Sequence, residues 1–78
     1  MDSYSTAIER YLAPADRTQA KLADAIKTSQ AAVSRYANGE RFPDAATARE
    51  IDKATDGEVP FSLWQQEMAQ RVGLDAAA

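Results

Sequence analysis

The chain has 78 residues, which is room for one domain with a thin core, and a domain of this size often needs a crosslink or a partner subunit. Because it contains no cysteine and no histidine, disulfides and thiolate or imidazole metal ligands are excluded. We therefore expect no metal and no cofactor, and association with a second chain is a reasonable expectation. The formal net charge of −3 is unfavourable for a nucleic-acid-binding protein unless the charges are unevenly distributed.

The first helix is expected over residues 4–12. Its apolar residues recur at helical spacing and form one stripe: Tyr4, Ile8, Tyr11 and Leu12. Pro14 ends it, because proline lacks an amide proton and disfavours helix at the preceding residue. At this spacing the two tyrosines are predicted to pack in the core rather than to stack on bases.

The second and third helices are expected over residues 18–26 and 29–37, with a short break at residues 27–28. Thr18 and Ser29 are good N-caps, and Asn38-Gly39 closes the third helix, where glycine supplies the left-handed conformation that helix ends favour. The inner face of the second helix carries Leu22, Ala23 and Ile26. The inner face of the third carries Val33, Tyr36 and Ala37.

Two more helices are expected over residues 44–55 and 62–72. The first begins at Pro43-Asp44 and stops at Asp56-Gly57, and residues 59–61 are predicted to be a short extended connector. Ser62 and Gln65 resemble a capping box, and Gly73 is expected to end the last helix. No strand-like alternation, repeat or internal linker occurs. The prediction is one all-α domain, a compact four- to five-helix protein over residues 1–78.

The segment over residues 18–38 has the features of two helices that cross closely. Ala23 is small enough for the crossing point, and the outer face of the third helix is left free to enter a DNA major groove. That face carries Ser29, Gln30, Ala31, Ser34 and Arg35. Glutamine can pair with adenine, arginine with guanine, and an alanine methyl can meet a thymine methyl.

The charge distribution agrees with this interpretation. Residues 17–41 carry five cationic and two anionic side chains, a net charge of +3, whereas residues 1–16 sum to −2 and residues 42–78 to −4. A locally basic face can bind phosphate while acidic faces point away. Five cations over such a stretch are also compatible with ordinary solvated surface.

The stretches TQAKLADAI, SQAAVSRYANGER and AREIDKATDGEV resemble the Cro/YdaS-like helix-turn-helix regulators of phages and prophages, within the lambda-repressor-like superfamily. The resemblance covers residues 5–60. It implies a lambda-repressor-like helix-turn-helix fold and a partner, the double-stranded DNA of an operator. It also implies that Gln30, Ala31, Ser34 and Arg35 face bases. The residues implied to contact the DNA backbone are Thr18, Gln19, Lys27, Ser29, Asn38 and Arg41.

The sequence departs from this family at two places. The turn often carries glycine where this chain has Lys27, so either Lys27 is strained or the turn is reshaped. The C-terminal segment PFSLWQQEMAQRVGL does not match the family's usual tail. Its apolar residues Phe61, Trp64, Met68 and Val72 either fold back on the core or form a dimer or partner face.

Among function classes, an enzyme is not expected. The chain lacks histidine and cysteine, has no nucleophile, phosphate or dinucleotide motif, and places Glu50 and Asp52 on different helix faces. Without an apolar run of 18 residues or a signal peptide, we expect a cytoplasmic protein with no membrane contact and no small-molecule ligand. The sequence favours a sequence-specific transcriptional repressor that binds a palindromic operator as a homodimer. The alternative is a protein-binding module, such as an antitoxin or a phage adaptor.

Overall fold

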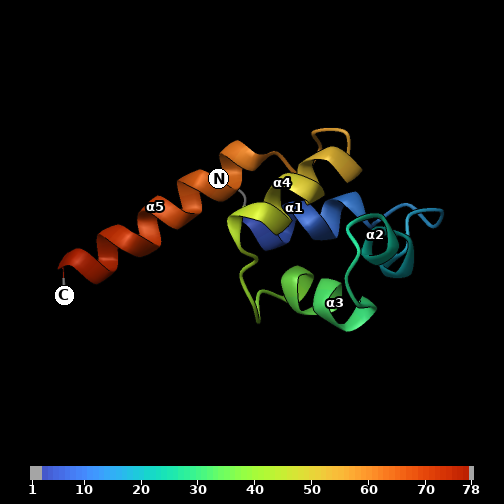
Figure 1. The fold of residues 1–78 in the computed structure, drawn as a ribbon, viewed down its shortest axis with the longest axis horizontal. Helices are drawn as coiled ribbons and strands as arrows, with labels where there is room; N and C mark the ends of the chain where they lie inside the picture. Colours follow the sequence, from blue (N-terminus) through green and yellow to red (C-terminus); the bar gives the residue numbers. More distant parts are fainter. Residues whose placement is uncertain (1–2, 78) are drawn as a thin grey trace.

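The computed structural model describes residues 3–77, with side chains described for residues 3–71. Over that range the chain forms helices and no strand, which confirms the all-α prediction. The helices are α1 (Tyr4–Tyr11), α2 (Gln19–Ala25), α3 (Gln30–Asn38), α4 (Ala45–Ala54) and α5 (Phe61–Ala77) (Figure 1). Within the described part of the chain, none of them is long and apolar enough to span a bilayer.

The first four helices begin at short polar side chains, which confirms the predicted caps Thr18 and Ser29. Each cap has an extended backbone, and its side-chain oxygen accepts a hydrogen bond from the amide three residues later. The caps are Ser3, Thr18, Ser29 and Asp44. The donor–acceptor distances are 3.2, 3.1, 3.1 and 2.8 Å in that order. These caps satisfy amides that would otherwise lack a partner at each helix start.

The core is built around α1, which lies in the middle of the body against α3 and α5 (Figure 1). Tyr4 and Ile8 are both 1% exposed, in agreement with the predicted apolar stripe of this helix. The rest of the core is supplied mainly by the inner faces of α2, α3 and α4. Its buried members there are Leu22, Ala23, Ile26, Val33, Tyr36, Ala37, Ala48 and Ile51.

The helix α5 differs from the prediction at both ends. It begins at Phe61 rather than after a capping box at Ser62, because the Asp52 carboxylate of α4 accepts a 2.8 Å hydrogen bond from the Phe61 amide. The cap is therefore a tertiary contact that no local pattern encodes. The helix also continues through Gly73, which ends a helix only when it adopts the left-handed conformation seen at Gly39 and Gly57.

Because α5 runs to Ala77, it projects beyond the body formed by the other helices (Figure 1). The overall extents are 42 × 22 × 19 Å, and α5 accounts for the long dimension. The start of α5 packs on α4 and α1. Its far end extends away from them in the figure.

Candidate DNA-binding surface

The two helices α2 and α3 form a tightly packed pair. Ala23 is 4% exposed at their contact, so its small side chain lets the helices approach closely, as predicted. The larger side chains that fill the space between them are all buried. They are Leu22, Ile26, Val33 and Tyr36. The inner face of α3 is thereby occupied, and its other face is left to solvent.

The turn between α2 and α3 keeps the geometry that usually requires glycine. Lys27 has φ +58°, in the left-handed region. The Thr28 amide donates to the Ala23 carbonyl at 2.9 Å and the Lys27 amide to the Asp24 carbonyl at 3.2 Å, which is the Schellman pattern. Of the two outcomes considered above, the turn is preserved and Lys27 is strained, because its Cβ disfavours a positive φ.

The predicted base-reading residues share the outer face of α3. Gln30, Ala31 and Arg35 are exposed, and Ser34 is half-buried. They recur with the spacing that places side chains on one side of a helix, and Asn38 continues the row at the end of α3. In Figure 1, α3 lies along one edge of the body with no other helix beyond it. No other helix therefore blocks this row of side chains from entering a DNA major groove, which is wide enough to admit one helix.

Some of the residues predicted to contact the DNA backbone lie around the outer face of α3, and others lie at the start of α2. Ser29 is exposed at the N-terminus of α3, and Lys27 and Arg41 are exposed in the segments before and after that helix. Thr18 and Gln19 lie at the start of α2 instead, and the Thr18 hydroxyl accepts a hydrogen bond from the Lys21 amide. Gln19 is half-buried.

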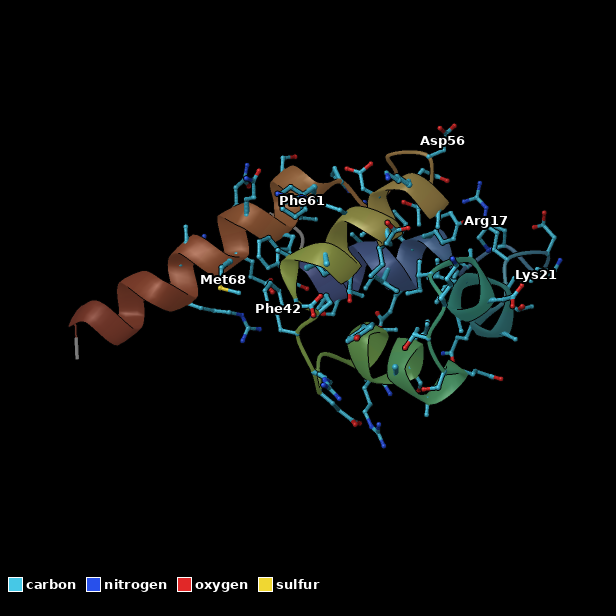
Figure 2. The ribbon with its side chains drawn as sticks, viewed as in Figure 1. Arg17, Lys21, Phe42, Asp56, Phe61 and Met68 are labelled. Carbon is cyan, nitrogen blue, oxygen red and sulfur yellow. The ribbon has the colours of Figure 1, made fainter. Side chains whose placement is uncertain are left out.

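The five cations of the central basic stretch divide into two groups. Arg17 pairs with Glu58 at 2.9 Å and lies 4.6 Å from the centre of the Tyr11 ring, so it ties the segment before α2 to the rest of the body. Lys21 donates to the Asp16 carbonyl at 2.9 Å. Figure 2 shows Arg17 and Lys21 at the end of the molecule opposite α5.

The other three cations are Lys27, Arg35 and Arg41. All three are exposed, and their side chains form no hydrogen bond or ion pair with the part of the chain that the structure describes. They precede, line and follow α3. Of the five cations over residues 17–41, the three without a side-chain partner are therefore those around this helix, where they are available to an anionic partner.

The apolar residues of α5 do not form one exposed stripe. Trp64 is 8% exposed, its ring stacks between those of Phe42 and Phe61, and its indole N–H donates to the Pro43 carbonyl at 2.8 Å. Trp64 thus belongs to the core of its own chain. Phe61 and Met68 are half-buried, and the side chain of Val72 lies outside the described residues.

Sequence reasoning missed Phe42, which joins α5 to the segment after α3. Its ring contacts Tyr4 edge-on at 5.8 Å between centroids and stacks with Trp64 at 5.7 Å. Figure 2 shows Phe42 and Met68 together on one side of α5 and Phe61 on the other. Phe42 lies outside any helix, where periodicity gives no signal. The one feature that could have indicated a packing residue is its aromatic side chain next to Pro43.

Among the described residues, no group of three or more acidic, cysteine or histidine side chains is placed to bind a metal ion. Asp44 has a pKa below its ordinary value, chiefly because Thr47 hydrogen-bonds its carboxylate and, to a smaller extent, because Arg41 is near. Asp44 is therefore anionic over the whole neutral range and acts as the cap of α4.

A comparison with protein families finds a match to a helix-turn-helix model over residues 8–61, which include α2, α3 and α4. No curated protein and no solved structure matches the chain. The family match and the accessible α3 face agree on the same pair of helices. The chain belongs to the helix-turn-helix family, and it is a DNA-binding transcription regulator of this type.

Proposed function

We propose that the protein is a Cro-like repressor of phage or prophage origin that binds a palindromic operator as a homodimer. The observation that carries the proposal is the outer face of α3, which is accessible, rich in hydrogen-bonding groups and bordered by unpaired cations. The resemblance of the α2–α3 sequence to the Cro/YdaS-like regulators supports the same conclusion. Each subunit inserts α3 into the major groove of one half-site.

Base recognition is assigned to four residues of α3. Gln30 and Arg35 carry the side chains that bond bidentately to adenine and guanine, respectively. Ala31 offers a methyl group for contact with thymine, and Ser34 can donate to or accept from a base edge. Because these residues lie within one row of a single helix, they would read adjacent base pairs.

Backbone contacts are assigned to residues that border α3 and to the start of α2. Lys27 and Arg41 supply charge on either side of α3, and Ser29 and Asn38 supply polar groups at its two ends. Thr18 and Gln19 would add contacts from the start of α2. Such contacts orient a protein on the duplex without specifying sequence.

The repressor role and the dimer rest on general arguments. A repressor needs only to occupy its operator, and we assign no surface of residues 3–71 to polymerase contact. One helix-turn-helix unit seldom supplies enough affinity alone, so two copies on two half-sites are expected. Phe61, Met68 and Val72 on α5 are proposed for the dimer contact, and Trp64 supports it from inside the core. Because Phe61 and Met68 lie on different sides of α5 (Figure 2), the partner subunit would contact both sides of this helix.

The alternative, a protein-binding module, draws on the acidic flanks of the chain and on the apolar residues around Trp64. With 8% of its surface accessible and its N–H bonded to Pro43, Trp64 is not available for that purpose. The aromatic residue of α3, Tyr36, is also buried, at 9% exposed. We therefore keep DNA recognition as the one proposal.

The test is a selection from random duplex DNA at two salt concentrations with the wild type, Arg35→Ala and Lys53→Ala. Lys53 is a matched control, because it is an exposed cation on α4 with 77% of its side chain accessible. Enrichment of a palindromic motif by the wild type and by Lys53→Ala, but not by Arg35→Ala, supports the proposal. Sedimentation of the protein–operator complex must then show two chains per duplex. Weak, salt-sensitive binding without enrichment contradicts it.

A further inference from the structure

A groove runs between α5 and the segment that follows α3. It has a volume of about 490 Å³, and its lining includes Arg41, Phe42 and Asp44 from the loop before α4 and Met68 and Arg71 from α5. A smaller hollow of about 150 Å³ adjoins it and shares Arg41, Phe42 and Arg71. The two arginines therefore line the same depression, although they are thirty residues apart in the sequence.

The structure holds Arg71 in this groove from two sides. Its guanidinium carbon lies 4.3 Å from the centre of the Phe42 ring, a cation–π geometry, and its Nη2 is 3.5 Å from Oε2 of Glu67. About half of the Arg71 side chain, 54%, remains accessible. A guanidinium has five N–H donors, so these contacts fix its position and still leave donors for a ligand.

The carboxylates in the groove are already engaged. Glu67 accepts the Tyr4 amide at 3.2 Å through Oε1 and pairs with Arg71 through Oε2. Asp44 accepts the Thr47 amide at 2.8 Å. Arg41, in contrast, forms no side-chain hydrogen bond or ion pair within residues 3–71. The N–H donors left without a partner in this groove therefore belong to Arg41 and Arg71, and such donors suit an anion.

The groove is continuous with the surface proposed to read DNA. Arg41 follows α3 after the left-handed turn at Gly39, and Tyr36 of α3 itself lines both hollows. A duplex whose major groove holds α3 has its sugar-phosphate backbone beside the ends of that helix. The free guanidinium donors and this continuity point to a DNA phosphate as the occupant.

We propose that Arg71, together with Arg41, binds a phosphate of the DNA backbone flanking the base pairs read by α3. The inference rests on the proposed function and extends it, because Arg71 lies on α5, outside residues 8–61 that match the helix-turn-helix family. The helix α5 is then part of the DNA interface. Phe42 is a positioning residue, because it holds the Arg71 guanidinium in the groove.

The test measures how the affinity for the selected operator depends on salt, with the full chain and Arg71→Gln. Glutamine keeps part of the aliphatic stem over Phe42 and removes the charge. Loss of one phosphate contact lowers the slope of log affinity against log salt by about 0.9. We expect that reduction for Arg71→Gln and for Arg41→Gln, with the same preference among operator sequences, and no change for Lys53→Ala.

A second measurement locates the contact. In an operator series with one methylphosphonate, a neutral phosphate analogue, per duplex, one flanking position should weaken wild-type binding several-fold. The same position should weaken Arg71→Gln less, because only Arg41 still contacts that phosphate. Unchanged melting temperature and Trp64 fluorescence show that the variant is folded. If Arg71→Gln keeps the wild-type slope and the same methylphosphonate profile, the inference is wrong while operator binding stands. If the wild type selects no operator, the proposed function itself has failed.

Discussion

The indole N–H of Trp64 donates a 2.8 Å hydrogen bond to the carbonyl oxygen of Pro43 in the interior of the protein. This bond connects α5 to the loop between α3 and α4, the same loop that carries Arg41 and Phe42. Because Trp64 is the single tryptophan of the chain, its fluorescence reports directly on this connection. The position of the segment that follows α3 thus depends on α5, most of which lies outside the family match.

Replacing Trp64 with phenylalanine should weaken this connection without removing the aromatic stack. The variant leaves the Pro43 carbonyl buried without its partner, which costs about 1–3 kcal/mol of unfolding free energy. Trp64→Ala should cost more, about 3–5 kcal/mol, because it also creates a cavity. Urea denaturation followed by circular dichroism measures both values. Equal stability of Trp64→Phe and the wild type would show that the hydrogen bond contributes nothing.

The Tyr4 hydroxyl is buried without a hydrogen-bond partner among the described residues. Tyr4→Phe removes this polar group from an apolar site and should raise the unfolding free energy by about 1 kcal/mol. Tyr11→Phe, at a half-buried tyrosine of the same helix, serves as the control and should change stability little. A clear loss of stability in Tyr4→Phe would mean that the hydroxyl has a partner in solution.

Tyr4 also predicts a dependence on alkaline pH. Burial, and to a smaller extent the charge of Asp52, raise the pKa of Tyr4 well above its ordinary value of 10.0. Below pH 10 Tyr4 is protonated in both the folded and the unfolded state, so the free energy of unfolding does not depend on its titration. As the pH rises above 10, the unfolded chain releases the proton while the folded chain retains it, so stability falls. A pH series of urea midpoints should show a shallower alkaline decline for Tyr4→Phe than for the wild type.

Lys27 gives a third prediction, on backbone strain. A residue with a Cβ pays about 1 kcal/mol for a left-handed conformation such as its φ of +58°, and glycine does not. Lys27→Gly should therefore stabilise the fold by roughly 0.5–1 kcal/mol. This figure already allows for the greater conformational entropy that glycine gives the unfolded chain. Lys27→Ala keeps the Cβ and should give no gain. If alanine stabilises as much as glycine, the lysine charge and not the backbone is responsible.

Features of the fold that depend on residues close together in the sequence could be predicted, and features that depend on distant residues could not. The caps at Thr18 and Ser29 were predictable because each accepts a hydrogen bond from an amide three residues away. The outer face of α3 was predictable because helical periodicity separates it from Val33, Tyr36 and Ala37. Both depend on neighbours in the sequence.

Features that depend on distant residues were not predictable. The start of α5 is set by Asp52 of α4, and Arg17 is withdrawn from the basic surface by Glu58. Phe42 and Arg71 meet only because α5 packs beside the loop after α3. A sequence pattern contains each of these residues but not the pairing between them. The sequence therefore did not show that Arg17 is paired with Glu58 or that Arg71 contacts Phe42.

The last prediction concerns Asp44, the one carboxylate that both caps a helix and lines the proposed phosphate groove. Asparagine is as good an N-cap as aspartate, so Asp44→Asn keeps the hydrogen bond to Thr47 and removes one negative charge beside Arg41. Operator affinity at low salt should rise several-fold, and the gain should shrink as salt screens the charge.

Asp44→Asn also distinguishes the effect of the N-cap hydrogen bond on stability from the effect of the negative charge. Because the pKa of Asp44 lies below its ordinary value of 3.8, through the hydrogen bonds from Thr47 and then the charge of Arg41, its ionised form stabilises the fold above about pH 4. That contribution is lost as the pH falls through the folded-state pKa. Asp44→Asn has no proton to bind, so its stability should decline less over this acidic range. Higher operator affinity combined with this flatter acid profile assigns Asp44 both roles, whereas unchanged affinity would place the DNA phosphates away from this groove.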